Sequence, residues 1–291
     1  MSNISLEYLF DEPLDLNENS LPDYSSLDFV SDGSHIYGEI MWPHNVKKEK
    51  HPCVIMLHGF PGSARNDDIS HALCRIGCVV IVPHHRGAWG SEGKYLITNC
   101  VEDAENLANY AHSEDFLKKY NVDSDQIFLL GHSMGGNSAL NAGKQLDFIR
   151  GIIMLAPYDP TCFLRLGKEK YIEALLNEGR ILNSDGIDAI YDDIVRNSQN
   201  LAFSNAFEKV RQKNLLIFAA KFDSVSLNSE MIFPLWDKLQ AYWKSSSFSA
   251  SERPVQRLIE YPVEHGLLGR RISMIREIAT FIKETVSLEN K

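Results

Sequence analysis

Residues 131–136 read Gly-His-Ser-Met-Gly-Gly and directly follow the apolar run 127–130, and this pairing constrains the fold of the chain most. A G-x-S-x-G pattern between a strand and a helix forms a tight turn, because small flanking residues let the two elements approach closely. The turn strains the backbone of its serine and pushes the hydroxyl outwards. The pattern therefore predicts that Ser133 is a nucleophile.

The flanking residues favour this interpretation over its alternative, a glycine-rich turn with only a structural role. The chain has 18 glycines, so a chance match to the pattern is easily found. Here, however, the preceding apolar run is typical of a buried strand, and residues 137–143 suit a helix packed against a sheet. The context is therefore the strand, turn and helix that the chemistry requires.

The composition is that of a soluble globular protein with one large domain. The chain has 291 residues, of which 44% are hydrophobic and 23% charged. No stretch approaches the roughly 18 continuous apolar residues of a membrane span. The formal net charge of −10, without a large Lys/Arg cluster, argues against nucleic acid. We expect neither a nucleic-acid nor a membrane partner.

The N-terminal residues and the cysteines indicate a cytoplasmic protein. Residues 1–7 lack both the basic start and the apolar core of a signal peptide. The cysteines are odd in number and form no C-x-x-C pair, which disfavours a disulfide framework or a zinc site. We expect reduced, mostly buried thiols at Cys53, Cys74, Cys78, Cys100 and Cys162.

The order of apolar and amphipathic segments predicts an α/β fold. Residues 26–30 and 36–42, separated by the turn sequence 31–34, indicate an N-terminal antiparallel hairpin. Fully apolar runs then alternate with helix-compatible segments, which indicates a mostly parallel, doubly wound sheet. The expected strands are 53–57, 78–82, 127–130, 151–155, 215–220 and 255–261, and the expected helices include 68–76, 100–120 and 270–286.

A helical insertion interrupts this alternation. Strand signals are missing from 158–213, where residues 168–178 and 186–197 are amphipathic. We therefore expect a core domain formed by 1–157 and 214–291 and a helical cap formed by 158–213. The cap is rich in aromatic side chains, which suits either an apolar or aromatic substrate group or packing on the core. The residues concerned are Tyr158, Phe163, Leu164, Tyr171 and Tyr191.

A serine nucleophile needs a histidine to take its proton and an acid to orient that histidine. Asp223 follows the strand 215–220 and His265 follows the strand 255–261, so both lie at carboxyl ends of parallel strands. We expect Ser133, His265 and Asp223 to form a catalytic triad. The alternative for the acid is Asp159, after the strand 151–155, whereas Glu264 is expected to be a solvated neighbour of the histidine.

Acyl transfer also needs donors for the oxyanion, and two backbone N–H groups are the usual solution. The amide of Met134 follows the nucleophile at a helix N-terminus. The second donor is expected from the loop 58–63, which reads His-Gly-Phe-Pro-Gly-Ser and can present the amide of Phe60. A plain strand-to-helix turn is the alternative interpretation of this loop.

These segments together resemble the α/β-hydrolase superfamily over nearly the whole chain. The matching parts are the loop 58–62, the elbow 131–135, Asp223, His265 and the segment 85–91, whose Arg-Gly-x-x-Gly-Ser is similar to one in cap-bearing esterases and in prolyl-oligopeptidase-like (S9-type) catalytic domains. The resemblance implies hydrolysis of an ester or an amide of a small molecule or short peptide through an acyl-enzyme. It implies neither a metal nor a cofactor.

Ester hydrolysis is the first expectation, because peptidases of this group usually carry an N-terminal propeller and the residues before Tyr24 are too few to form one. A peptidase or aminoacyl amidase with the same triad is the alternative. A non-catalytic binding protein on a hydrolase scaffold is the third, since a fold does not guarantee catalysis. The adjacent His84 and His85 point to opposite faces of a strand and have no partner at ligand spacing, so no metal site is expected there.

Overall fold

The computed structural model describes residues 4–13, 16, 18, 20–249 and 252–287. In these residues an eight-stranded sheet has the order β1-β4-β6-β5-β7-β8-β9-β10. The strands from β6 to β10 along this order are parallel neighbours, whereas β4 is antiparallel to both β6 and β1. The bounds are β1 Asp23–Ser26, β4 Gly38–Trp42, β5 His51–Leu57, β6 Val79–Pro83, β7 Val122–His132, β8 Ile149–Leu155, β9 Asn214–Ala220 and β10 Gln256–Tyr261.

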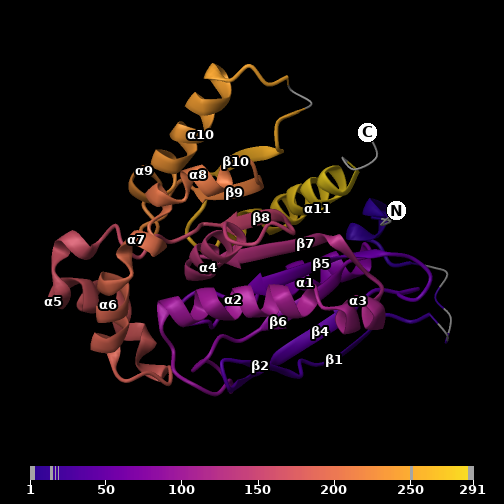
Figure 1. Cartoon of the computed structure of the whole chain (residues 1–291), viewed down its shortest axis with the longest axis horizontal. Helices are drawn as coiled ribbons and strands as arrows, with labels where there is room; N and C mark the ends of the chain where they lie inside the picture. Colours follow the sequence, from indigo (N-terminus) through magenta and orange to yellow (C-terminus); the bar gives the residue numbers. More distant parts are fainter. Residues whose placement is uncertain (1–3, 14–15, 17, 19, 250–251, 288–291) are drawn as a thin grey trace.

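Helices cover both faces of the sheet because the central strands are apolar at every position. In β5, Cys53, Ile55 and Leu57 face one hydrophobic core, whereas Val54 and Met56 face the other. The first core is closed by α2 (Ile97–Ala111), α3 (Glu114–Tyr120), α4 (Met134–Gly143) and α10 (Phe233–Ser245); the second is closed by α1 (Asp67–Arg75) and α11 (Arg271–Ser287) (Figure 1). This is the α/β-hydrolase architecture that the alternating segments predict.

The N-terminal hairpin is shorter than the sequence predicts. Strands β2 (Phe29–Ser31) and β3 (Ser34–Ile36) pair around Asp32 and Gly33, and the rest of the expected second strand becomes β4 of the main sheet. The backbone changes sheets at Gly38, where a Cβ atom would lie 2.5 Å from the carbonyl oxygen of Val82. Glycine therefore permits the close approach of β4 to β6.

The single helix expected over 100–120 is wrong, because the chain forms two helices there. The helix α2 ends at Ala111, and the side chain of Ser113 caps α3 by accepting the N–H of Phe116 at 3.4 Å. The residues before and after Ser113 both favour a helix. The interruption between α2 and α3 therefore depends on Ser113 and its immediate neighbours.

Between β8 and β9 the chain is helical. The segment contains α5 (Lys168–Tyr171), the π-helix η3 (Ile172–Leu176), the 3-10 helix η4 (Asn177–Ile181), α6 (Ile187–Arg196), α7 (Ser198–Leu201) and α8 (Phe207–Val210), and short 3-10 turns η2 (Leu164–Leu166) and η5 (Phe203–Asn205). In Figure 1, α5 and α6 project beyond one end of the sheet. The division of the chain into a core and a cap stays a prediction.

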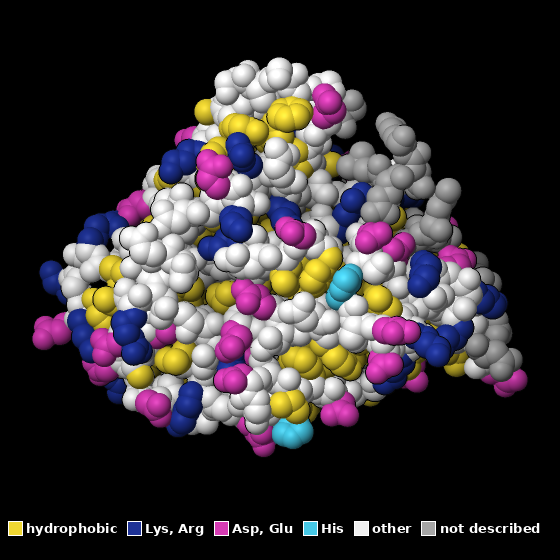
Figure 2. All heavy atoms as spheres, in the orientation of Figure 1, with side chains coloured by type: hydrophobic (Ala, Val, Ile, Leu, Met, Phe, Trp, Pro, Cys, Tyr) yellow, Lys and Arg dark blue, Asp and Glu magenta, His cyan; other side chains and the backbone are white. Residues whose placement is uncertain are grey.

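Three further features of the described residues are the absence of a membrane-spanning helix, the state of the cysteines and the character of the surface. Within the part that the structure describes, no helix has the length and apolarity needed to cross a bilayer. All five cysteines carry free thiols, and four of them are buried. Charged and apolar side chains are interspersed over the face shown in Figure 2.

Candidate active site

Ser133 occupies the sharp turn between β7 and α4. Its backbone has φ 56° and ψ −119°, a combination that residues other than glycine rarely adopt. The turn is tight enough that a Cβ atom on Gly131 would lie 2.0 Å from the Gly135 oxygen, and one on Gly135 would lie 2.2 Å from the Leu57 oxygen. The glycines of the motif are therefore required for the approach of β7, α4 and β5, as the G-x-S-x-G pattern predicts.

A chain of hydrogen bonds joins the three residues expected to form the triad. The Oγ atom of Ser133 lies 2.9 Å from Nε2 of His265, and Nδ1 of His265 lies 2.7 Å from Oδ2 of Asp223. Since a carboxylate only accepts, Nδ1 carries the ring proton and Nε2 is left to accept the proton of Ser133. Asp223 follows β9 and His265 follows β10, so the parallel sheet brings both to the edge that carries Ser133.

Asp223 is held by its own loop. Its Oδ1 atom accepts the N–H groups of Val225 at 2.8 Å and Ser226 at 2.7 Å, and its side chain is fully buried. Both carboxylate oxygens are therefore in use, one by the loop and one by His265. This arrangement leaves the imidazole a single orientation, in which its outer nitrogen faces the serine.

The alternative acids have other partners. Asp159 is buried, and its carboxylate accepts from the N–H and hydroxyl of Thr161 at 2.9 and 2.7 Å and from the N–H of Phe203 at 2.8 Å. Burial raises the pKa of this carboxyl. Glu264 is exposed and accepts the N–H of Leu268 at 3.0 Å. The structure therefore brings Asp223, and neither of these carboxylates, to the imidazole.

The two main-chain N–H groups expected to bind an oxyanion belong to residues that line the cavity of Ser133. Phe60 and Met134 both line the cavity that contains Ser133, and neither amide has an acceptor among the residues that the structure describes. Met134 is the first residue of α4, where the helix dipole favours negative charge. Both residues therefore remain the candidates for the two oxyanion donors.

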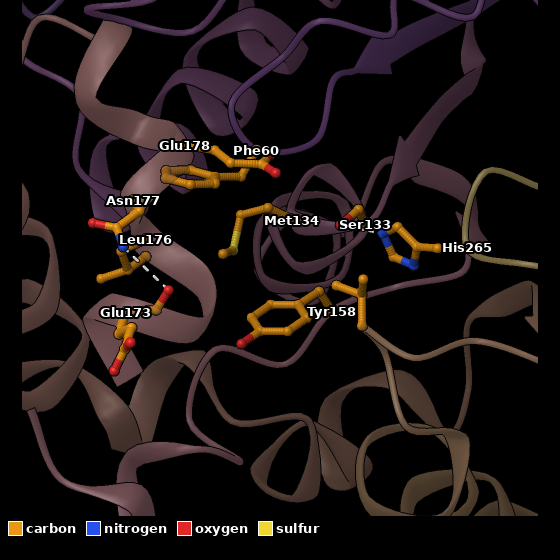
Figure 3. Close-up of a pocket in the computed structure, with 10 residues that line it drawn as sticks. Phe60, Ser133, Met134, Tyr158, Glu173, Leu176, Asn177, Glu178 and His265 are labelled. Atoms are coloured by element: carbon orange, nitrogen blue, oxygen red, sulfur yellow. Dashed lines mark hydrogen bonds between the residues drawn. The ribbon is translucent and has the colours of Figure 1, made fainter. Parts of the chain in front are cut away.

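The cavity in front of Ser133 has a volume of about 380 Å³ and lies between the core and the segment 158–213 (Figure 3). Phe60, Met134, Tyr158, Leu176 and Val225 supply apolar walls, and Glu173, Asn177 and Glu178 supply polar ones. Of the five aromatic and apolar residues singled out in the predicted cap, only Tyr158 lines this cavity. Tyr171, by contrast, is fully buried and its hydroxyl donates to Pro160 O at 2.9 Å.

The cavity wall is also where the two parts of the chain touch. A Cβ atom on Gly179 of η4 would lie 2.3 Å from the ring of Phe60, so only a glycine lets η4 pack there. The Phe60 ring in turn contacts Tyr95 edge-on, with centroids 5.8 Å apart. The segment that carries one candidate oxyanion amide is therefore packed directly against η4.

His58 supports this loop as a buried, neutral ring. Its Nδ1 donates to Gly59 O at 2.7 Å, and its Nε2 accepts the N–H of His85 at 3.1 Å. Burial, reinforced by the nearby His85, lowers the pKa of His58 well below its usual value. The ring therefore links the ends of β5 and β6 at neutral pH, and its role is to hold backbone in place.

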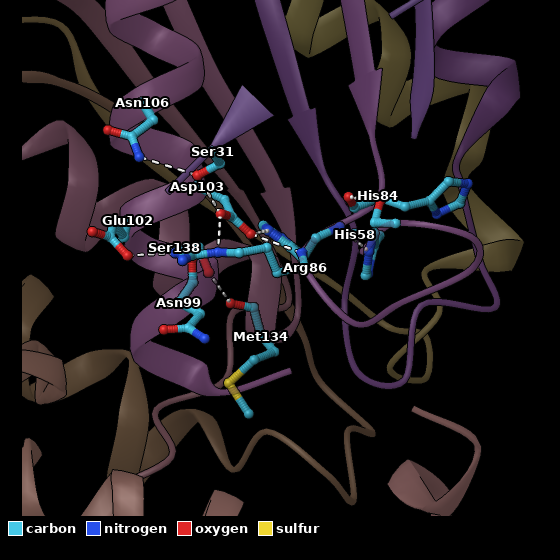
Figure 4. A network of polar contacts seen from close by, with 12 residues as sticks. Ser31, His58, His84, Arg86, Asn99, Glu102, Asp103, Asn106, Met134 and Ser138 are labelled. Carbon is cyan, nitrogen blue, oxygen red and sulfur yellow. Dashed lines mark hydrogen bonds and ion pairs between the residues drawn. The ribbon is translucent and has the colours of Figure 1, made fainter. Parts of the chain in front are cut away.

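A buried ion pair beside the site is the feature that sequence reasoning missed. The Arg86 Nε atom lies 2.6 Å from Oδ1 of Asp103, and its backbone N–H donates to Oδ2 of the same carboxylate at 2.8 Å (Figure 4). Ser31 also donates to Asp103 at 2.7 Å. This network holds the loop after β6 against α2, and Trp89 of that loop donates to Pro61 O at 2.8 Å. The sequence offered one signal for this ion pair: Asp103 is an acidic residue among the apolar positions that α2 buries.

No metal site is apparent in the described ranges, where no group of three or more His, Cys, Asp or Glu side chains is placed to hold an ion. The rings of His84 and His85 both lie beside His58, with centroids 5.5 and 4.7 Å from it. Their further partners differ, because His84 stacks on Tyr37 whereas Nδ1 of His85 lies 3.8 Å from Oδ2 of Asp103, and the expected divergence of the two side chains stays a prediction.

Known hydrolases are similar to this chain in sequence. A family model described as serine aminopeptidase, S33, matches residues 48–165. YitV of Bacillus subtilis, named as a candidate esterase, is 26% identical over 203 residues, which are 62% of this chain and 74% of that protein.

Solved structures of esterases share the fold. A brefeldin A esterase, described as a bacterial homologue of human hormone-sensitive lipase, has a TM-score of 0.67 at 18% identity and covers 96% of this chain and 82% of its own. Est1E of Butyrivibrio proteoclasticus with ferulic acid has a TM-score of 0.65 at 20% identity and covers 90% of this chain and 99% of its own. The chain thus has the α/β-hydrolase fold, and these likenesses together indicate a hydrolase of the esterase or peptidase type.

Proposed function

We propose that this hydrolase is a serine esterase that cleaves carboxylic esters of small molecules through an acyl-enzyme. The observation that carries the proposal is the hydrogen-bonded series Ser133, His265 and Asp223, with separations of 2.9 and 2.7 Å. Its atoms stand in the order that general-base activation of a serine requires.

In the proposed first step Ser133 Oγ attacks the ester carbonyl carbon while its proton moves to Nε2 of His265. The imidazolium that forms is stabilised by the Asp223 carboxylate, which stays ionised. The carbonyl oxygen becomes negative and accepts hydrogen bonds from the N–H groups of Phe60 and Met134. Removal of one such donor typically costs about 3 kcal/mol in the barrier.

The tetrahedral species then collapses, the C–O bond to the leaving group breaks, and His265 gives its proton to the departing alkoxide. Water attacks the acyl-enzyme in the same manner, with His265 again as the base, and releases the acid and Ser133. No redox change occurs, so the residues present suffice for the reaction.

We further propose that residues 158–213 act as a cap that shapes the substrate pocket. Tyr158 and Leu176 come from this segment and line the cavity with Phe60 and Met134 of the core. Apolar walls of this kind favour an acyl or alcohol group that is hydrophobic close to the reacting carbonyl. Est1E, which has the same fold, binds ferulic acid, and this ligand is consistent with such a hydrophobic group.

Amide hydrolysis by a peptidase or aminoacyl amidase is the second candidate. It is favoured by the family model, whose description is a serine aminopeptidase. The two candidates use the same triad and differ in the leaving group, because an amine must be protonated by His265 as it departs.

Initial rates on matched p-nitrophenyl acyl esters and aminoacyl p-nitroanilides test the proposal, with the Ser133→Ala protein as background. The esterase proposal predicts ester turnover that depends on Ser133 and no comparable cleavage of anilides. Comparable anilide cleavage would instead establish the amidase, and no Ser133-dependent turnover of either series would exclude both.

A further inference from the structure

The ring of Phe60 lies between the cavity and two partners that pack against it. A Cβ atom on Gly179 of η4 would lie 2.3 Å from the Cζ atom of this ring, and Tyr95 contacts the ring edge-on with centroids 5.8 Å apart. Gly179 and Tyr95 are both buried. Phe60 itself is partly buried and lines the cavity of Ser133. Space next to the ring is therefore found on the cavity side.

Gly179 and Tyr95 belong to segments that are tied together. The carbonyl oxygen of Asn183, two residues beyond the end of η4, accepts the main-chain N–H of Tyr95 at 2.8 Å. The N–H of Asn183 donates to Gly87 O at 2.8 Å, and its side chain donates to Gly93 O at 2.7 Å. These bonds join the end of η4 to the loop after β6. The two partners of the ring therefore form one wall, which resists being pushed apart.

The main chain around Phe60 is held as well. The carbonyl oxygens of the residues before and after it accept from Nδ1 of His58 at 2.7 Å and from Nε1 of Trp89 at 2.8 Å. A side chain can change its rotamer without moving the peptide groups that flank it. We therefore expect a methyl group at position 179 to turn the Phe60 ring into the cavity and to leave the N–H of Phe60 in place.

The chemistry of the proposed reaction decides which part of the substrate meets this ring. In the tetrahedral species the reacting carbon is bonded to Ser133 Oγ, to the oxyanion, to the leaving oxygen and to the acyl group. The leaving oxygen must lie near Nε2 of His265, which gives it a proton. The acyl group therefore points away from His265. Figure 3 shows the rings of Phe60 and Tyr158 on that side of the cavity, so the acyl group enters the space that they line.

We propose that Phe60 and Gly179 determine which acyl groups are accepted, and that the preferred substrates are esters of bulky, flat, apolar acids. The inference rests on the proposed esterase function and names its substrate class. Aromatic faces such as those of Phe60 and Tyr158 pack well against flat groups. Because Gly179 has no side chain, the Phe60 ring leaves this space open. The alcohol lies beside His265, whose side chain is 21% exposed, so the size of the alcohol has little effect.

Two series of esters test the acyl and the alcohol side separately. The acyl series is p-nitrophenyl acetate, butyrate and 3-phenylpropanoate, and the alcohol series is ethyl, butyl and 2-phenylethyl acetate. In the wild-type protein we expect kcat/KM to rise by about tenfold or more from acetate to 3-phenylpropanoate, and to vary by less than about threefold along the alcohol series. Selection by the alcohol and not by the acyl group overturns the proposal.

Variants assign this preference to the two residues through the ratio of kcat/KM for 3-phenylpropanoate to that for acetate. In Gly179→Ala the ratio should fall by about tenfold or more, because one methyl group of room in an apolar pocket has an effect of this size. In a Phe60→Leu background the same substitution should change the ratio by less than about twofold, because the ring that meets the methyl group is gone.

The matched control is Gly186→Ala in the same helical segment. Its φ of 100° strains an alanine, but no atom lies within 4 Å of the added Cβ, so the segment is disturbed without contact to Phe60. This variant should keep the wild-type ratio. The proposal is overturned if Gly186→Ala lowers the ratio as much as Gly179→Ala, or if Gly179→Ala acts equally with and without the Phe60 ring.

The single variant Phe60→Leu tests the same space without adding an atom, and so decides the question if Gly179→Ala does not fold. It keeps the main-chain N–H and removes the ring that bounds the acyl group. We expect kcat/KM for p-nitrophenyl diphenylacetate, relative to that for acetate, to rise by about tenfold over the wild-type value. An unchanged ratio contradicts the proposal.

Binding separates this inference from the proposed function. In the Ser133→Ala protein, 4-phenyl-2-butanone, a neutral ketone shaped like the 3-phenylpropanoyl group, is titrated and followed by NMR. Binding that is weakened by about fivefold when Gly179→Ala is added supports the acyl pocket even where no ester is turned over. Equal binding with and without Gly179→Ala overturns the pocket even where esters are hydrolysed.

Discussion

Nε2 of His132 donates a hydrogen bond to the main-chain oxygen of His265 at 3.1 Å, which ties the residue before the nucleophile to the loop of the base. The two rings lie 5.0 Å apart at 47°. Burial, together with the nearby His265, lowers the pKa of His132 to about 4. At neutral pH the His132 ring therefore carries one proton, on the nitrogen that faces the carbonyl.

His132→Phe is expected to keep the packing of this ring and to lose its hydrogen bond. We expect kcat/KM for an ester to fall by about tenfold through kcat, because one net hydrogen bond that holds the base in register is removed. Steady-state kinetics measure the effect, and His112→Phe is the control, since His112 stacks on Phe148 with centroids 4.1 Å apart and contacts no triad residue. An unchanged kcat in His132→Phe would contradict this role.

Asp223→Asn and Asp159→Asn distinguish the two acids. Asp223→Asn should lower kcat by on the order of 10³ or more, because the amide stabilises the wrong imidazole tautomer and cannot stabilise its cation. Asp159→Asn should leave kcat within about threefold and lower stability by about 1–3 kcal/mol, because one of its acceptor bonds is lost. Kinetics and urea unfolding on both proteins are the measurement. The assignment fails where Asp159→Asn is the variant that abolishes turnover.

Ser133 should limit stability through its backbone. A non-glycine residue at φ 56° and ψ −119° costs about 1–3 kcal/mol, and glycine largely avoids that cost. We therefore expect Ser133→Gly to unfold at a higher urea concentration than Ser133→Ala, the reverse of the ordinary order for this pair of residues. Both variants lack the nucleophile, so activity plays no part in the comparison. A Ser133→Gly protein less stable than Ser133→Ala would show that the turn is unstrained.

Stability should fall on acidification because buried neutral histidines must be protonated on unfolding. Burial, and after it the nearby Arg65, lowers the pKa of His84 from its usual 6.5 to about 4. Between these values the unfolded chain binds more protons than the folded one, so the free energy of unfolding decreases as the pH falls from about 6.5 to 4. For one such group the loss between pH 7 and pH 5 is about 2 kcal/mol.

His84→Phe should therefore be less sensitive to acid. The ring stacks on Tyr37 with a centroid distance of 5.8 Å and an interplanar angle of 7°, contacts that a phenyl ring can keep. Urea unfolding at pH 7 and pH 5 should show the wild-type protein losing about 2 kcal/mol more than the variant. Equal losses in the two proteins would mean that His84 is already protonated in the folded state at pH 5.

Local patterns predicted the sheet, and they put the three residues of the candidate triad in loops that this sheet brings together. Each central strand is a continuous apolar run, and a parallel sheet necessarily brings the residues that follow β9 and β10 to the edge where Ser133 lies. The order of Ser133, Asp223 and His265 along the chain was therefore enough to predict that these residues lie close together. The distances that join them are 2.9 and 2.7 Å.

Features that depend on pairing at long range were not predictable in this way. The contact of Arg86 with Asp103 requires that the loop after β6 meets α2. Neither residue type by itself predicts that meeting. The cap side chains present the same difficulty, because an amphipathic pattern does not say which face meets the cavity. Glu173, Glu178 and Tyr158 could be assigned to one wall only once the packing of η3 and η4 was known.

Reaction with a fluorophosphonate, followed by intact-protein and peptide mass spectrometry, tests the central claim most directly. The account predicts one phosphonyl adduct on Ser133, formed quickly in the wild-type protein, slowly in His265→Ala and not at all in Ser133→Ala. Ester turnover should be lost in proportion to labelling. Absence of an adduct on Ser133, or labelling as fast in His265→Ala as in the wild type, would contradict the triad and favour a non-catalytic binding protein on a hydrolase scaffold.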